Sequence, residues 1–255
     1  MKYYSSICLM VKDEEDYINE WLEYHKKLGF QHFYIYDNNS TIPVKSYLNN
    51  DDSITIIEWT DKNIDRHKRA FMNCFKKFKN ESKWIACIDI DEFIVLKTKQ
   101  KNINDFLINY EDYGGLGINW LMFGSSNLKN SPETGVLKNY VYRAPYEFNP
   151  HEIIKTIVNT KYVKEEYYED YGIHNFLYNN NYAVNENFEE IKGIRIEPSY
   201  NKIQLNHYFL KSKNDMETKI KKGGGNGIKR TIEELEKYDN ICNSIYDNTI
   251  NNIFK

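Results

Sequence analysis

The sequence predicts an α/β protein with a Rossmann-like, mostly parallel sheet, helices on both faces of that sheet, and antiparallel additions in the C-terminal half. Short apolar segments alternate with segments whose apolar residues recur at helical spacing, and this alternation runs through residues 5–93. Polar residues follow directly after several of the apolar segments. Such alternation is typical of sheets that bind ligands at the carboxyl ends of their strands.

The elements of the N-terminal half can be assigned in order. A first strand is expected at residues 5–11, followed by a helix that begins in the acidic run 13–16 and ends at Gly29. The elements expected next are strands at 32–36 and 53–59, an amphipathic helix at 65–79 and a fully apolar strand at 84–88.

After residue 100 the periodicity weakens. We expect a short helix at 103–110, a strand at 116–123 and irregular strands up to about residue 210. Thr231 and Glu234 form a capping box that opens a terminal helix. The sequence thus predicts one domain, made of an N-terminal half (1–95), a second half (96–228) and a C-terminal helix (229–255).

The composition is that of a folded, soluble protein. Of its 255 residues 41% are hydrophobic and 28% are charged, and the net charge is −3. Basic residues gather only within 221–230, so no nucleic-acid-binding surface is expected. The four cysteines show no paired spacing. The apolar run at 7–11 is too short for a signal peptide or a membrane span, which predicts a cytoplasmic protein without a transmembrane segment.

Two carboxylates, Asp89 and Asp91, follow the apolar strand at 84–88. In an extended strand, residues i and i+2 point to the same side, so both carboxylates would face one site. Two neighbouring anions need a cation, and oxygen ligands suit Mg²⁺ or Mn²⁺. The alternative is a solvated acidic turn. A position after the last of the alternating strands favours the metal site.

Several longer segments resemble glycosyltransferase family 92 and its bacterial relatives in the family 2-like group. They are CLMVKDEEDYINEWLEYHKKLGFQHFYIYDNNS at 8–40, WIACIDIDEF at 84–93, WLMFGSS at 120–126, KTIV at 155–158 and NHYFLKS at 206–212. The resemblance spans roughly residues 5–225. It implies a GT-A fold whose Asp-x-Asp motif bridges a divalent metal to the diphosphate of a nucleotide-sugar donor. Asp89 and Asp91 occupy those positions, and His207 is the candidate for a further metal ligand.

The resemblance also implies residues that bind the donor. The base and ribose are expected near the ends of the first two strands, at Lys12, Asp13, Glu14 and Asp37. Among these Asp37 is favoured, because Asp13 and Glu14 also suit the first turn of a helix. The family often carries Gln where this chain has His67, so Arg66 and Arg69 are the donor contacts expected from that helix.

Positive charge near the leaving diphosphate would stabilise the transition state. Lys211, Lys213 and Lys222 are the candidates, and the glycine-rich loop from Lys222 to Gly227 is either a lid over the donor or a linker to the last helix.

An inverting reaction needs a carboxylate that deprotonates the acceptor. Asp170 is the candidate base, with Glu147 and Glu152 as alternatives. Trp120 is either a platform for the acceptor sugar or a core residue.

The function expected is metal-dependent hexosyl transfer, with a UDP-sugar favoured as donor. The expected acceptor is a glycan or lipid-linked glycan, which is compatible with peripheral membrane association. Two alternatives remain at this point. One is a Mg²⁺-dependent phosphohydrolase of the haloacid dehalogenase type, although Phe93 stands where that motif carries Thr or Val. The other is a nucleotide-sugar-binding module without catalytic activity.

Overall fold

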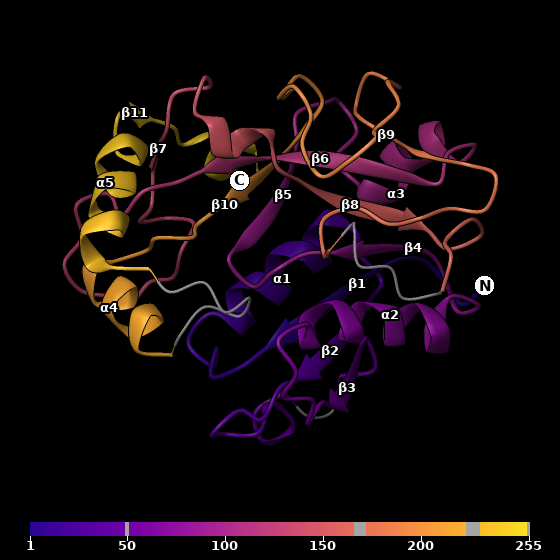
Figure 1. The fold of residues 1–255 in the computed structure, drawn as a ribbon, viewed down its shortest axis with the longest axis horizontal. Coiled ribbons are helices and arrows are strands. Elements are labelled where there is room, and N and C mark those ends of the chain that lie inside the picture. The colour runs from indigo at the N-terminus through magenta and orange to yellow at the C-terminus, as the bar shows by residue number, and fades with distance from the viewer. Residues whose placement is uncertain (49–50, 166–171, 223–229, 254–255) are drawn as a thin grey trace.

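The computed structural model describes residues 1–48, 51–165, 172–222 and 230–253. Its centre is a large, curled sheet of nine strands in which the order is β3-β2-β1-β4-β8-β6-β10-β5, with β9 paired to β6 (Figure 1). The first four strands in the chain run parallel: β1 (Tyr3–Val11), β2 (His32–Asp37), β3 (Ile54–Glu58) and β4 (Ser82–Cys87). This confirms the parallel N-terminal half.

Antiparallel pairing enters in the C-terminal half, as expected. Strand β8 (Ile154–Asn159) runs antiparallel to both β4 and β6 (Gly115–Met122). Strand β10 (Ile203–His207) is parallel to β6 and antiparallel to β5 (Glu92–Leu96), which forms the far edge. The short strand β9 (Ala183–Val184) completes this sheet, and β7 (Tyr142–Arg143) pairs with β11 (Ile245–Tyr246) in a second one.

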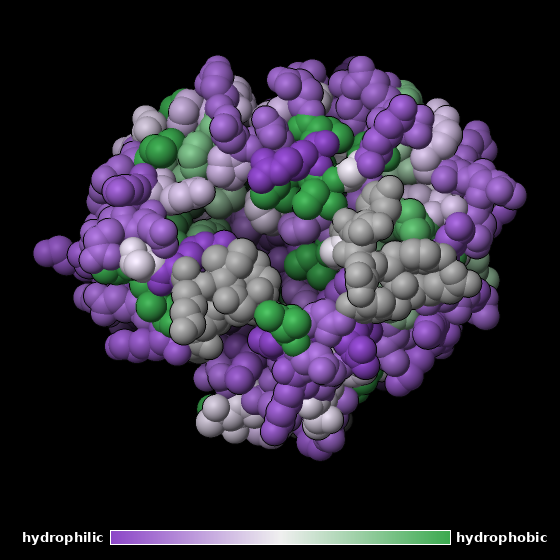
Figure 2. Space-filling view, viewed as in Figure 1, coloured by the Kyte–Doolittle hydropathy of each residue, from purple (hydrophilic) through white to green (hydrophobic). Residues whose placement is uncertain are grey.

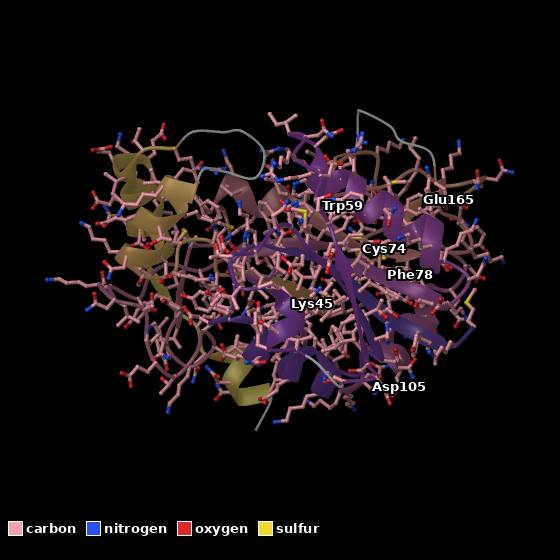
Figure 3. All side chains as sticks on the ribbon, turned by 90° about the horizontal axis from the view of Figure 1, so that it is seen from below. Lys45, Trp59, Cys74, Phe78, Asp105 and Glu165 are labelled. Carbon is pink, nitrogen blue, oxygen red and sulfur yellow. The ribbon has the colours of Figure 1, made fainter. Side chains whose placement is uncertain are left out.

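Helices cover both faces of the sheet, because alternate strand residues enter two different cores. Ile7 and Leu9 of β1 pack in one core with residues of α1 (Ile18–Leu28) and α3 (Ile103–Leu107). Cys8, which lies between them, packs in the other core with α2 (Arg66–Phe78). Figure 3 shows Cys74 and Phe78 on α2. Each fully buried large apolar side chain contributes about 1.5–3 kcal/mol.

Helix α2 agrees with the helix expected at 65–79 within one residue at each end. The C-terminal helix expected at 229–255 was wrong in extent, because the helix in this region ends at Cys242 and is followed by β11 and a separate short helix. The expected helix at 103–110 is α3 continued by the 3-10 turn η2 (Ile108–Tyr110). Helix α4 (Lys213–Lys222) precedes α5 (Ile232–Cys242), whose capping box between Thr231 and Glu234 is confirmed. Short helical segments occur at η1 (Val44–Ser46), η3 (Asn149–Glu152) and α6 (Thr249–Ile253). In the described ranges, no helix has the length and apolar character needed to cross a membrane.

The start of the first helix was predicted wrongly. The acidic run at 13–16 does not form its first turn, because α1 begins at Ile18. Asp13 instead has a left-handed backbone conformation, with φ of 54°. Its carboxylate accepts a hydrogen bond from Thr41 N over 2.6 Å, and its own N–H donates to Ser40 Oγ over 3.1 Å. Asp13 therefore ties the loop after β1 to the loop after β2.

Candidate active site

The two carboxylates of the Asp-x-Asp motif lie on a tight turn and not in an extended strand, which corrects the expected local geometry. Strand β4 ends at Cys87, and Glu92 N donates to Asp89 O over 3.1 Å, which closes the turn into β5. Ile88 and Ile90 are buried in the core, whereas the Asp89 and Asp91 side chains are 24% and 13% exposed. Ile88 and Ile90 are thus apolar anchors of the turn. Their burial directs the side chains of Asp89 and Asp91 away from the core, and each aspartate contacts a different set of partners.

Asp89 is paired with a buried lysine. Lys155 Nζ, on β8, donates to Asp89 Oδ2 over 2.9 Å, and the Lys155 side chain is fully buried. Burial alone would raise the pKa of Asp89, but the charge and hydrogen bond of Lys155, together with the neighbouring His67, hold that pKa below its ordinary value. Asp89 is therefore an anion whose orientation is set by β8.

A histidine faces the other oxygen of Asp89. His67 Nε2, in the first turn of α2, lies 3.2 Å from Asp89 Oδ1, yet neither atom has a hydrogen-bond partner among the described residues. Burial lowers the pKa of His67 to about 4, so the ring is neutral at physiological pH. A neutral nitrogen and a carboxylate oxygen that face each other in this way form a place where a shared cation would fit.

Glu92 connects the turn to the neighbouring strands from a fully buried position. Its Oε2 accepts the N–H of Asp89 over 2.8 Å, and its Oε1 accepts the indole N–H of Trp120 over 2.7 Å. Lys155 Nζ lies 3.9 Å from the same carboxyl group. Burial raises the pKa of Glu92 well above its ordinary value, and Lys155 opposes that shift. Glu92 and Lys155 together support the Asp89 side of the turn.

Asp91 has a separate set of partners. Its Oδ1 lies 3.4 Å from His207 Nε2, and its Oδ2 lies 3.2 Å from Lys219 Nζ on α4. Burial would raise the pKa of Asp91, but the charge of Lys219 and the contact with His207 hold it well below its ordinary value. The structure thus brings Asp91 and His207 together, as the resemblance implied, and adds Lys219.

Strand register explains how His207 reaches this position. It is the last residue of β10, where it is paired with Glu92 of β5 on one side and with Met122 of β6 on the other. The next residue, Tyr208, donates its backbone N–H to Asp91 O over 2.8 Å. Trp120, on β6, places its ring against both His207 and His174, with centroid distances of 4.4 and 5.3 Å. Trp120 therefore lines the site and packs within it.

A divalent metal at this site would take its protein ligands from the aspartates of the turn and the histidines that face them. Within the described ranges, no three His, Cys, Asp or Glu side chains converge as a complete metal-binding group. The pairs His67–Asp89 and His207–Asp91 are, however, spaced at 3.2 and 3.4 Å. Two neighbouring ligands of an octahedral ion with bonds of about 2.1 Å lie about 3 Å apart. The spacing of these pairs fits an ion that is bound by one or two side chains and whose coordination shell is completed by phosphate oxygens and water.

The expected nucleoside residues lie in the loops after β1 and β2. Asp37 accepts the backbone N–H of Ser40 over 3.0 Å and that of Val44 over 2.9 Å, one with each oxygen. Asp37 therefore stabilises the conformation of the loop that follows β2. Arg66 donates from Nε to Asn38 Oδ1 in the same loop over 3.0 Å, and Lys12 is exposed.

Lys211 contacts the segment that follows β1. Its ammonium lies 3.9 Å from Glu14 Oε2 and 3.3 Å from the centre of the Tyr17 ring. Burial lowers the pKa of Lys211, while the charges of Glu14 and Asp91 oppose that shift.

The face of the molecule that is drawn in Figure 1 has a hollow near its centre, in front of the sheet (Figure 2).

Several other candidates have partners outside the Asp89–Asp91 turn. Lys213 pairs with Glu236 on α5, Glu152 pairs with Arg195, and Arg69 pairs with Asp61. Glu147 is exposed. Asp170 and the glycine-rich stretch 223–227 lie outside the described residues, as does the side chain of Lys222, the last residue of α4.

Sequence reasoning overlooked several residues of the site: Lys155, Glu92, His174 and Lys219. It considered His67 but set it aside in favour of Arg66 and Arg69. Lys155 had a visible signal, because a single lysine interrupts the otherwise apolar and neutral segment IIKTIV at 153–158. A lysine inside a buried strand requires an acidic partner. Lys219 had no such signal, since it is one of several lysines in a polar helix.

Comparison with known proteins gives a consistent result. The family model for glycosyltransferase family 92 matches residues 2–223. A glycosyltransferase family 92 protein of Ricinus communis is 29% identical over 161 residues, which cover 58% of this chain and 28% of that protein. One from Oryza sativa subsp. japonica is 31% identical over 144 residues, covering 54% and 24%. One from Arabidopsis thaliana is 26% identical over 161 residues, covering 56% and 27%. The matched region thus spans about a quarter of each relative's length.

Proposed function

The chain belongs to glycosyltransferase family 92, and from this premise we propose that it is a metal-dependent hexosyltransferase. The donor is a nucleoside diphosphate sugar, with uridine as the favoured nucleoside, and the acceptor is a hydroxyl group of a glycan or lipid-linked glycan. Family membership favours this function over phosphohydrolysis. The observation that carries the metal dependence is the pairing of Asp91 with His207 at 3.4 Å, beside the ammonium groups of Lys219 and Lys211.

In this proposal Asp91 and His207 hold Mn²⁺ or Mg²⁺, and Asp89 faces the same ion or its water shell. The ion supplies positive charge that neutralises the departing diphosphate. Lys155 and Glu92 keep the Asp89 side of the turn rigid, so that little reorganisation is needed during reaction. Lys211 and Lys219 would bind the diphosphate, and the loops after β1 and β2 would hold the nucleoside, with Asp37 as the favoured contact.

On the acceptor side, Trp120 offers part of its ring for stacking on a sugar, while its indole N–H is held by Glu92. Asp170 remains our candidate for the base. The step it would perform is removal of the proton from the attacking acceptor hydroxyl, as the bond from the sugar to the diphosphate breaks. We place this reaction in the cytoplasm, with the acceptor held at or near a membrane surface.

His207→Ala is expected to weaken Mn²⁺ binding in the presence of UDP by roughly tenfold or more, because one of two side-chain ligands is lost. His32→Ala is the matched control, since His32 is also buried but lies at the start of β2, away from the carboxyl ends of the parallel strands. Calorimetric titration of Mn²⁺ into each folded variant makes the measurement. Equal Mn²⁺ affinities in wild type and His207→Ala would remove His207 from the metal site.

A further inference from the structure

Lys219 holds a position that is unusual for a surface lysine. It projects from α4, its side chain is 38% exposed, and its ammonium group has three partners. These are Asp91 Oδ2 at 3.2 Å, the backbone carbonyl of Phe209 at 2.8 Å, and the face of the Phe209 ring at 3.6 Å from its centre. Hydrogen bonds and a cation–π contact together fix the ammonium beside Asp91.

The two oxygens of Asp91 are therefore shared between two elements. Oδ1 faces His207 at the end of β10, and Oδ2 faces Lys219 on α4. The ammonium of Lys219 forms an ion pair with this carboxylate, and it neutralises Asp91 in the protein alone. A partly buried carboxylate without such a partner would be costly.

A divalent ion bound to Asp91 would conflict with this arrangement. With a bond of about 2.1 Å to Oδ1, on the His207 side, the ion would lie within roughly 7.5 Å of the Lys219 ammonium, on the other side of the same carboxylate. The single negative charge of Asp91 cannot balance both the ion and the ammonium, so the two cations compete for it unless a further anion binds beside them. The diphosphate of a nucleotide provides that anion, and it also offers the ammonium new oxygen partners.

We propose that Lys219 neutralises Asp91 in the free protein and transfers to the diphosphate when nucleotide and metal bind together. Metal binding is therefore weak in the free protein and becomes tight only in the presence of the nucleotide. This inference rests on the proposed function, because it takes the nucleoside diphosphate as the ligand. It assigns Lys219 two opposed effects: competition with the metal before the nucleotide arrives, and binding of phosphate afterwards.

The test uses Lys219→Met, which removes the charge and keeps much of the apolar stem. Mn²⁺ binding is measured by the loss of the free-ion electron paramagnetic resonance signal, first without nucleotide and then with saturating UDP or GDP. Without nucleotide, the variant is expected to bind Mn²⁺ roughly 5- to 10-fold more tightly than wild type. With saturating Mn²⁺, its affinity for the nucleotide is expected to fall by a similar factor. The mutual enhancement of metal and nucleotide binding should shrink accordingly.

Lys221→Met is the matched control, because Lys221 lies on the same helix, is exposed and carries the same charge. It should leave both affinities within twofold of wild type. If Lys219→Met binds Mn²⁺ alone no more tightly than wild type does, the inference is overturned while the proposed function stands. If wild type binds no Mn²⁺ with or without UDP or GDP, the metal assignment falls, and the role of Lys219 falls with it.

Discussion

Asp91→Asn is expected to lower sugar transfer by about 10²- to 10³-fold and to leave the fold intact. The amide has nearly the same shape as the carboxylate but cannot supply the negative charge that the metal and Lys219 require. The Asp91 side chain is partly exposed and lies on a turn, so the apolar anchors Ile88 and Ile90 keep their burial. Transfer is measured as release of nucleoside diphosphate, and folding as the thermal midpoint.

The control for Asp91→Asn is Asp105→Asn, which makes the same chemical change at an exposed position on α3, at the periphery in Figure 3. It should transfer sugar like wild type. Wild-type turnover by Asp91→Asn, or full turnover by wild type in EDTA, would contradict the role of Asp91 as a metal ligand.

Lys155→Met is expected to produce the largest loss of stability, roughly 3–5 kcal/mol in the free energy of unfolding. Lys155 is fully buried, and its loss leaves Asp89 and the buried Glu92 without their cation. Adding Asp89→Asn to Lys155→Met should recover part of the loss, because one uncompensated charge is removed. Urea unfolding of the single and double variants measures both effects.

The comparison for Lys155→Met is Lys213→Met, which breaks an exposed ion pair with Glu236 and should leave the free energy of unfolding close to the wild-type value. A loss for Lys155→Met as small as that, or a double variant less stable than the single one, would show that Lys155 does not compensate buried carboxylates.

The N-terminal half of the fold was accessible to sequence reasoning because its signals are local. Strands β1, β2 and β4 each contain a short apolar run that polar residues follow, and parallel order follows from the helices in this half of the chain. The C-terminal half depends on long-range pairing. Nothing in the KTIV segment indicates that it inserts antiparallel between β4 and β6, yet this insertion is what brings Lys155 to Asp89.

The same distinction applies to the site. Asp89 and Asp91 stand out in the sequence because they interrupt an apolar run. Their local geometry could not be predicted, because alternating apolar and acidic residues fit an extended strand as well as a turn in which Ile88 and Ile90 are buried. The acidic run at 13–16 misled for a similar reason. Acidic residues favour both a first helical turn and a loop closure, and the contact with Thr41 that decides between them is distant in sequence.

The central claim, that a nucleoside diphosphate and a divalent metal bind together at Asp91, is tested most directly by nucleotide binding with and without the ion. UDP-, GDP- and dTDP-sugars are each added at about 100 times their dissociation constant, with Mn²⁺ or with EDTA, and the thermal midpoint is recorded. At least one donor should raise the midpoint by roughly 5–10 °C in Mn²⁺, equivalent to about 2.7 kcal/mol, and by far less in EDTA. Stabilisation of equal size in Mn²⁺ and EDTA, or none by any donor, would contradict the claim.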